Sequence, residues 1–252
     1  MVAAWKEQAM AQPQRKVEPA ARAVPPPVAL SVFDLDRTLT ILPTYSRFLL
    51  FAARHRAPWR LLLLPILLPI ALLYALKLVP RRTMKQAMHR LALGRALPQR
   101  DAARLADRFA RHLVARGLYA EGIALIERER AAGRRIVIAS AAPHLYTAAL
   151  ARRLGIADVI ASASTWRDGC LTPAIGGANC YGADKRGRIE AFLAQSGIAR
   201  DAAHIRFYSD HVSDLPVFEL ADEAIAVNPS RALRAVAAER RWPVLDWSAA
   251  AR

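Results

Sequence analysis

Ser31-Val-Phe-Asp-Leu-Asp-Arg-Thr-Leu-Thr40 is the stretch around which the rest of this chain is organised. A β-rich run, Val28 to Phe33, ends there in two acids, Asp34 and Asp36, with Thr38 two residues further on. Carboxylates at the carboxyl end of a buried parallel strand lie where open α/β sheets bind ligands. Two acids this close suit a divalent cation and a phosphate better than a salt bridge. Because Asp-x-Asp-x-Thr is a short pattern, its meaning depends on what the later strands contribute.

The later part of the chain alternates between helical and β-rich segments. From Leu118 onward, helices are expected between short apolar runs that read as strands. These runs are Arg135–Ser140, Asp158–Ala161, His204–Asp210, Ala224–Val227 and Pro243–Asp246. Strands alternating with helices predict an α/β fold with a doubly wound, Rossmann-like parallel sheet. A β-hairpin is expected over residues 164–182, with turns at Asp168-Gly169 and Gly176-Gly177.

Polar side chains end several of these strands or open the helix that follows. They are four carboxylates, one hydroxyl and one ammonium: Asp34, Asp36, Asp210, Asp214, Ser140 and Lys185. Because the carboxyl ends of parallel strands meet at one edge of a sheet, we expect these groups to lie together. Crowded carboxylates would repel and take up protons without a cation. Mg²⁺ prefers oxygen ligands and retains several waters, and the serine and lysine could hold a phosphate beside it.

This order of motifs resembles the haloacid dehalogenase superfamily of phosphohydrolases. Asp34-Leu-Asp-Arg-Thr38 is similar to its first motif, Ile136-Val-Ile-Ala-Ser140 to the second, Lys185 to the third and Asp210-x-x-x-Asp214 to the fourth. The superfamily often has Gly where Arg37 stands. The resemblance covers roughly residues 28–247 and implies a catalytic core over residues 28–46 and 117–252. Residues 47–116 then form an inserted α-helical cap, as in the phosphoserine-phosphatase-like subgroup.

The resemblance also implies a role for each site residue. Asp34 would be the nucleophile that forms an aspartyl-phosphate, and Asp36 the general acid and then base. Mg²⁺ would be held by Asp34, by Asp210 and by the backbone carbonyl of Asp36, while Asp214 would orient the lysine or assist the metal. Phosphate would be bound by Thr38, Ser140 and Lys185. His211, inside the fourth motif, either contacts substrate or is an ordinary solvated loop residue.

The cap contains an unusually apolar segment, Leu61–Val79, interrupted by Pro65 and Pro69. As a helix it would be about 28 Å long, enough to cross a hydrocarbon core. A single crossing would separate Asp34 from all the later site residues. Basic residues on both flanks favour keeping both ends on the cytoplasmic side. We therefore expect a re-entrant or interfacial helical hairpin, with a helix buried inside the cap as the alternative. A Leu/Pro-rich segment at this place also resembles small bacterial phosphatidylglycerophosphatases of the same subgroup.

Composition restricts the possible partners. The formal net charge is +16, supplied mainly by arginines spread along the chain, and it favours an anionic membrane surface, a phosphorylated substrate or nucleic acid. A codon bias towards arginine would give the same excess. No nucleic-acid-binding motif is recognisable, so that partner is not expected. Two cysteines, Cys170 and Cys180, do not make a disulfide framework, which favours a reducing cytoplasm. Residues 1–27 are expected to form a disordered tail.

These observations favour a Mg²⁺-dependent phosphomonoesterase acting on a lipid phosphate such as phosphatidylglycerophosphate. It would work at the cytoplasmic side of a bacterial inner membrane, bound to an anionic surface. The alternative is a soluble cytoplasmic phosphatase for a small metabolite such as phosphoserine. A third possibility is a membrane-associated module that has kept the fold without turnover. The intact set of Asp34, Asp36, Lys185 and Asp210 argues against this last one.

Overall fold

The computed structural model describes residues 27–174 and 180–247. The tail expected over residues 1–27 therefore lies outside the described residues apart from Pro27, as does the turn expected at Gly176-Gly177. The predicted fold class is confirmed, because the main sheet has six strands in the order β4-β3-β1-β7-β8-β9 and every pairing within it is parallel. The strands are β1 (Val28–Phe33), β3 (Arg135–Pro143), β4 (Asp158–Ser162), β7 (Ala203–Ser209), β8 (Glu223–Val227) and β9 (Val244–Leu245).

Strand β1 lies in the middle of this sheet and sets the position of the site. Phe33, its last residue, lies opposite Ile138 of β3 and Tyr208 of β7. The amide of Asp34 continues the ladder by donating to the carbonyl of Tyr208 at 2.9 Å. Asp34, Ser140 and Asp210 therefore lie one or two residues beyond this common level, at the same edge of the sheet.

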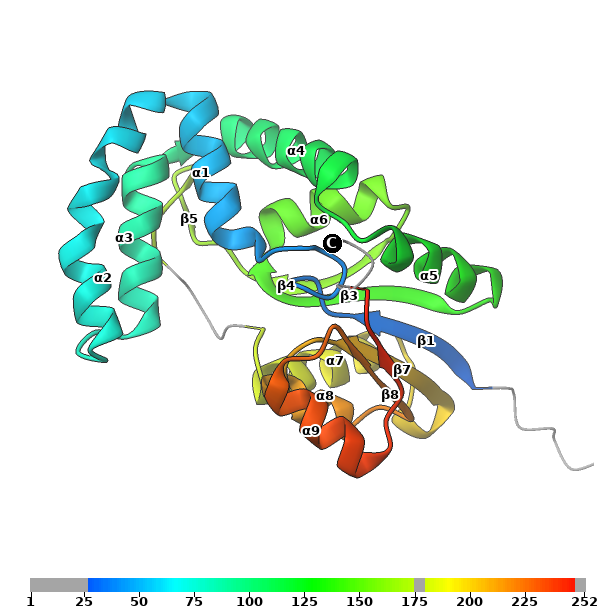
Figure 1. The fold of residues 1–252 in the computed structure, drawn as a ribbon. Helices are drawn as coiled ribbons and strands as arrows, with labels where there is room; N and C mark the ends of the chain where they lie inside the picture. Colours follow the sequence, from blue (N-terminus) through cyan, green and yellow to red (C-terminus); the bar gives the residue numbers. More distant parts are fainter. Residues whose placement is uncertain (1–26, 175–179, 248–252) are drawn as a thin grey trace, which may run out of the picture.

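Helices cover both faces of the sheet (Figure 1). One face carries α5 (Ala120–Ala131) and α6 (His144–Arg153), and the other carries α7 (Ala183–Gln195), α8 (Leu215–Phe218) and α9 (Arg231–Arg240). The buried apolar residues accordingly form two clusters. Leu30 and Val32 of β1 belong to one cluster and Phe33 to the other, as the two-residue period of a strand requires.

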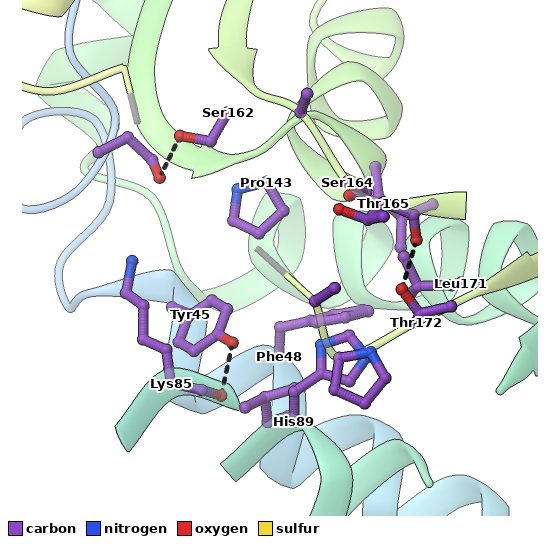
Figure 2. Close-up of a pocket in the computed structure, with 16 residues that line it drawn as sticks. Tyr45, Phe48, Lys85, His89, Pro143, Ser162, Ser164, Thr165, Leu171 and Thr172 are labelled. Carbon is purple, nitrogen blue, oxygen red and sulfur yellow. Dashed lines mark hydrogen bonds between the residues drawn. The ribbon is translucent and has the colours of Figure 1, made fainter. Parts of the chain in front are cut away.

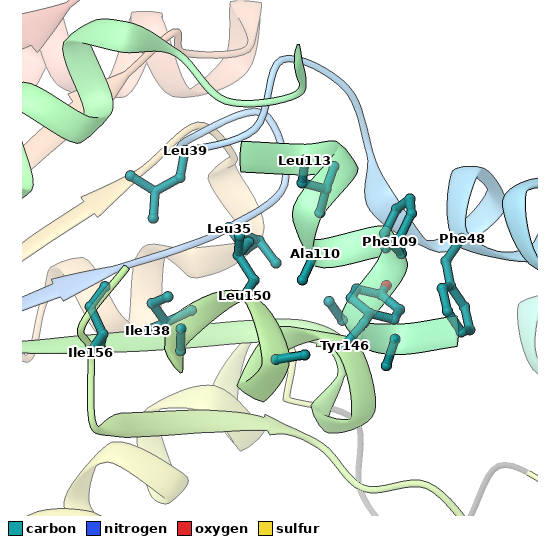
Figure 3. Close-up of a cluster of buried hydrophobic side chains, with 14 of the residues drawn as sticks. Leu35, Leu39, Phe48, Phe109, Ala110, Leu113, Ile138, Tyr146, Leu150 and Ile156 are labelled. Atoms are coloured by element: carbon teal, nitrogen blue, oxygen red, sulfur yellow. The ribbon is translucent and has the colours of Figure 1, made fainter. Parts of the chain in front are cut away.

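The segment between β1 and β3 contains α1 (Thr44–Arg56), the 3₁₀ helix η1 (Pro58–Leu67), α2 (Leu68–Ala75), α3 (Arg81–Leu93), β2 (Leu97–Pro98) and α4 (Gln99–Arg116). Not all of it stands apart from the core, because α4 packs along α6. Figure 3 shows Phe48 of α1, Phe109 of α4 and Tyr146 of α6 in one cluster, with ring centroids 4.8–5.4 Å apart. These aromatic contacts fix α1 and the start of the insert against the helices that cover the main sheet.

A small antiparallel sheet ties the far end of the insert to the core. Its strands are β2, β5 (Trp166–Arg167) and β6 (Cys170–Leu171). The predicted turn between β5 and β6 is present, with Asp168 and Gly169 both at positive φ (47° and 70°). This left-handed pair is the geometry that closes a two-residue hairpin.

The apolar segment forms a helical pair, but not as one α-helix. Its first part is the 3₁₀ helix η1, and an α-helix begins only at Leu68. Pro65 and Pro69 lack the amide hydrogens that a continuous α-helix would use, and Pro69 lies in the first turn of α2, where this loss is tolerated. The chain reverses near Lys77, whose φ is +60°, and α3 returns beside α2 (Figure 1).

The side chains of this apolar segment are not buried. No residue of η1 or α2 is buried, and Leu62 is 81% exposed. Among the described residues, Pro58–Ala75 is the one helical segment long and apolar enough to cross a membrane. The alternative of a helix enclosed within the cap therefore does not describe this chain.

Candidate active site

A cavity of about 280 Å³ opens at the carboxyl edge of the sheet, where β1, β3 and β7 end. Six of the seven predicted site residues line it together: Asp34, Asp36, Ser140, Lys185, Asp210 and Asp214. The seventh, Thr38, does not line it. Thr38 is fully buried beyond the turn at Arg37, and its hydroxyl finds no partner in the described part of the chain. The structure therefore gives no support to the phosphate contact expected of Thr38.

Lys185 joins two of the carboxylates. It lies in the first turn of α7, is 2% exposed, and its ammonium donates to Asp34 Oδ1 at 2.8 Å and to Asp214 Oδ2 at 2.6 Å. Ser209, the last residue of β7, donates to the same oxygen of Asp214 at 2.7 Å. Burial alone would lower the pKa of Lys185, but the two carboxylates raise it above its usual range. The lysine is therefore a permanent cation that fixes the orientation of Asp34.

The remaining negative charge in the cavity is not balanced by this lysine. Burial raises the pKa of Asp34 to about 7, despite the opposing ammonium of Lys185. Burial, together with the charges of Asp34 and Asp214, raises the pKa of Asp210 to about 8. Asp214 Oδ1 is also buried and has no hydrogen-bond partner in the described residues. Such a cluster favours either protonation or the arrival of a further cation.

Asp36 is held by the start of helix α1. Its Oδ1 accepts hydrogen bonds from the backbone amide of Thr44 at 2.8 Å and from the Thr44 hydroxyl at 2.7 Å. The Thr44 hydroxyl also lies 3.0 Å from the hydroxyl of Tyr146, and both side chains are fully buried. Asp36 itself is half-buried and lines the cavity. Its orientation is thus set by the side chains of Thr44 and Tyr146, while the carboxylate still lines the cavity.

Three further residues frame the cavity. Ser140 is buried, and its oxygen accepts from the amide of Ala142 at 3.1 Å. The ring of His211 bonds Ser213 within its own loop, accepting from its amide at 3.2 Å and lying 2.9 Å from its hydroxyl. Arg37 is exposed at a φ of +61°, and its positive charge opposes the rise in the pKa of Asp210. Arg37 thus adds a second cation at the mouth of the site.

Sequence reasoning missed the residues that position the acids. Thr44 and Tyr146 hold Asp36, and Ser209 holds Asp214, yet none of them belongs to a recognisable motif. Ser209 could have been noticed, because it directly precedes Asp210 at the end of a predicted strand. Tyr146 could not, since it lies 102 residues from Thr44 in the sequence.

The fold and this cavity agree with what comparison with known proteins shows. Residues 31–219 match the haloacid dehalogenase-like hydrolases, and the chain belongs to that family. The family expected from the four motifs is therefore confirmed.

The chain is also similar to individual proteins of known sequence or structure. It is 35% identical over 131 residues to a probable phosphatase of Mycobacterium tuberculosis, covering 52% of this chain and 45% of that protein. The chain thus spans about half the length of the curated relatives it matches first. A solved protein of unknown function from Bordetella pertussis Tohama I is 28% identical, with a TM-score of 0.75, over 88% of this chain and 99% of that one. A substrate-bound phosphoserine phosphatase shares the fold, with a TM-score of 0.57 and 16% identity over 86% and 92% of the two chains.

Proposed function

We propose that this protein is a Mg²⁺-dependent phosphomonoesterase that works through an aspartyl-phosphate on Asp34. The observation that carries the proposal is the cavity in which Lys185 fixes Asp34 while Asp36 and Asp210 face the same space. Relatives named as phosphatases support the same reaction.

The residues present fit a magnesium ion. Asp34 and Asp210 are carboxylates whose pKa values are raised mainly by burial, and the charge of a divalent cation beside them would oppose that rise. No group of three or more His, Cys, Asp or Glu side chains among the described residues could hold a metal alone. Mg²⁺ suits such a sparse site, because it binds through one or two carboxylates plus water and substrate phosphate. Asp34, Asp210 and the backbone carbonyl of Asp36 would hold it, and when bound it would neutralise charge on the phosphate oxygens.

The chain's own residues account for the two chemical steps. In the first, an oxygen of Asp34 bonds to phosphorus as the ester P–O bond breaks, and Asp36 gives its proton to the leaving oxygen. In the second, water bonds to phosphorus, Asp36 takes the water proton, and Asp34 leaves as a free carboxylate. Lys185 holds Asp34 throughout, and the Ser140 hydroxyl is placed to donate to a phosphate oxygen.

A phosphorylated lipid is the substrate class that the apolar segment favours, phosphatidylglycerophosphate being one example. Eight large apolar side chains of η1 and α2 are exposed: Trp59, Leu62, Leu64, Ile66, Leu68, Leu72, Leu73 and Tyr74. Water-exposed apolar patches of this kind mark interaction sites, and basic residues near a membrane add about 1 kcal/mol each on an anionic surface. Exposed Arg54, Arg56, Lys77 and Arg82 flank the patch. The membrane involved would be the cytoplasmic face of a bacterial inner membrane.

A groove beside this segment supports the same substrate class. Its volume is about 1080 Å³, and it lies between η1–α2 and α3. Leu63, Ile66 and Ile70 line it together with Arg60 and Arg90. The volume slightly exceeds that of typical ligand sites, which span roughly 300–1,000 Å³. An apolar floor with arginines beside it suits an acyl chain next to an anionic headgroup.

Phosphate release from a panel of esters tests the proposal. Small phosphomonoesters, including phosphoserine, are compared with lipid phosphates in mixed micelles, each with Mg²⁺ and with EDTA. We expect Mg²⁺-dependent release, fastest from the lipid phosphates, and co-sedimentation of the protein with anionic vesicles. Release from small esters alone, by a protein that ignores anionic vesicles, would favour the soluble metabolite phosphatase.

A further inference from the structure

A second cavity adjoins the catalytic one at the seam between the inserted helices and the core. Its volume is about 50 Å³. One water needs roughly 10–15 Å³ on the same measure, so the space accepts a few waters or one small organic group. Side chains of α1 and α3 form one side, and the ends of β3 and β4 together with the loop after β4 form the other (Figure 2). The polar and aromatic members of this lining include Tyr45, Phe48, Lys85, His89, Ser164 and Thr165.

This seam cavity begins where the leaving group of an ester would emerge. Ala141 lines both cavities and directly follows Ser140. Tyr45 lines the seam cavity and directly follows Thr44, which holds Asp36. A phosphate beside Asp34 with its leaving oxygen near Asp36 would therefore direct the rest of the molecule into this space.

Two buried polar atoms of the seam-cavity residues lack hydrogen-bond partners. They are His89 Nε2 and Thr165 Oγ1, neither of which bonds to any described residue. Buried polar side-chain atoms in native proteins are nearly always hydrogen-bonded. Two such atoms without partners beside one cavity therefore point to a ligand. Burial lowers the pKa of His89 to about 4, so its ring is neutral at physiological pH. A neutral imidazole and a hydroxyl can each donate or accept a hydrogen bond, which suits the hydroxyl groups of an alcohol.

The charges of the seam cavity limit which alcohol can enter. None of the described residues that line it is Asp or Glu, and Lys85 is its one permanent cation within that set. An ammonium group would therefore meet a cation and no carboxylate. Uncharged hydroxyl groups or an anionic group meet no such conflict.

We propose that the seam cavity is the leaving-group subsite of the proposed phosphatase, in which His89 and Thr165 select phosphate esters of polyols over those of amino alcohols. The inference rests on the proposed function. It assigns glycerol-like phosphates as substrates and disfavours phosphoserine. The rest of a larger polyol ester could extend from the seam cavity into the groove beside η1–α2, because both are lined by Thr172, Pro173 and Ala174.

The test compares kcat/KM for three esters: glycerol phosphate, propyl phosphate, which lacks the hydroxyl groups, and phosphoserine. For the wild-type protein we expect glycerol phosphate to exceed each of the others by roughly tenfold or more. Thr165→Val should lower the ratio of glycerol phosphate to propyl phosphate by about three- to tenfold, the usual effect of one lost hydrogen bond. Its Tm should not fall, because Thr165 Oγ1 bonds to nothing in the described protein.

A second variant and a control complete the design. His89→Leu should lower the same ratio, and His89→Gln, which keeps a polar group, should recover part of it. His112→Leu, at an exposed histidine on α4 outside the cavity, should keep the wild-type ratio. Unchanged ratios in both the Thr165 and His89 variants, or a wild-type preference for phosphoserine, would overturn the subsite while leaving the phosphatase proposal standing. Absence of Mg²⁺-dependent release from every ester, p-nitrophenyl phosphate included, would overturn both.

Discussion

Replacing Thr44 by valine should separate the positioning of Asp36 from its chemistry. The substitution keeps the shape of the side chain but removes the hydroxyl that donates to Asp36 Oδ1 at 2.7 Å and meets Tyr146 at 3.0 Å. A hydrogen bond to a charged group is worth about 1.5–3 kcal/mol. The backbone amide of Thr44 still donates to the same oxygen at 2.8 Å, so Asp36 stays near its place but less firmly held.

The expected loss follows from these contacts. If about 2 kcal/mol of that interaction acts in the transition state, kcat falls roughly 30-fold, since 1.36 kcal/mol is one factor of ten. The fully buried Tyr146 hydroxyl loses its partner as well, which lowers the free energy of unfolding by about 1–3 kcal/mol. Tyr146→Phe is the matched control, because it removes the same buried contact and leaves the Thr44–Asp36 bond in place. We expect it to change kcat by less than about threefold.

The assay compares an alkyl phosphate with p-nitrophenyl phosphate. An alkoxide needs a proton to leave, whereas p-nitrophenolate leaves without one, so a misplaced general acid should slow the alkyl ester far more. Thr44→Val should therefore show a large defect with the alkyl ester and a small one with the nitrophenyl ester. An equal defect with both esters, or none with either, would refute the role given to the Thr44–Asp36 contact.

Three further outcomes are expected. Lys185→Met leaves buried Asp34 without its cation, so kcat should fall by at least about a hundredfold and thermal scans should show lower stability, as when a buried ion pair loses one partner. In EDTA, Tm should fall as pH rises from about 4 to 8. The folded pKa values of Asp34 and Asp210, about 7 and 8, exceed the ordinary 3.8. In this range the folded state therefore holds protons that the unfolded chain has released, and the stability they give is lost as pH passes the folded pKa values. Mg²⁺ should reduce the dependence of Tm on pH. If Asp210→Asn showed the same dependence as the wild-type protein, titration of Asp210 could not be its cause. Leu62→Glu combined with Leu72→Glu should abolish co-sedimentation with anionic vesicles while sparing hydrolysis of small esters; retained vesicle binding would exclude the apolar segment as the contact.

The position of the site could be predicted because it depends on backbone topology. Asp34 and Asp210 directly follow strands β1 and β7, and Ser140 lies in the second half of β3; parallel strands bring their carboxyl ends to one edge. The direction of individual side chains could not be predicted in this way. Thr38 fits the motif by spacing, but the chain turns at Arg37 with a φ of +61°, and the Thr38 side chain is buried away from the cavity. Spacing places a residue near a site, whereas local backbone geometry decides where its side chain points.

The contacts that orient Asp36, and those that line the seam cavity, depend on packing between segments far apart in the sequence. Asp36 is held through Thr44 to Tyr146, which the fold brings together only when α1 packs on α6. The seam cavity likewise needs α3 to lie against the end of β3 and the loop after β4. Its two unpaired atoms, on His89 and Thr165, therefore cannot be predicted from the sequence. Composition did reveal the apolar segment at 61–79. That its side chains are exposed rather than enclosed required the structure.

The covalent step is the centre of this account, and trapping it is the most direct measurement. The protein is mixed with Mg²⁺ and p-nitrophenyl phosphate, quenched in acid during turnover, treated with borohydride, and its peptides are analysed by mass spectrometry. Borohydride reduces an aspartyl-phosphate to homoserine, so the account predicts homoserine at position 34 and unmodified aspartate at 36, 210 and 214. Homoserine at another of these positions, or a protein that turns over this ester while Asp34→Asn keeps full activity, would contradict it.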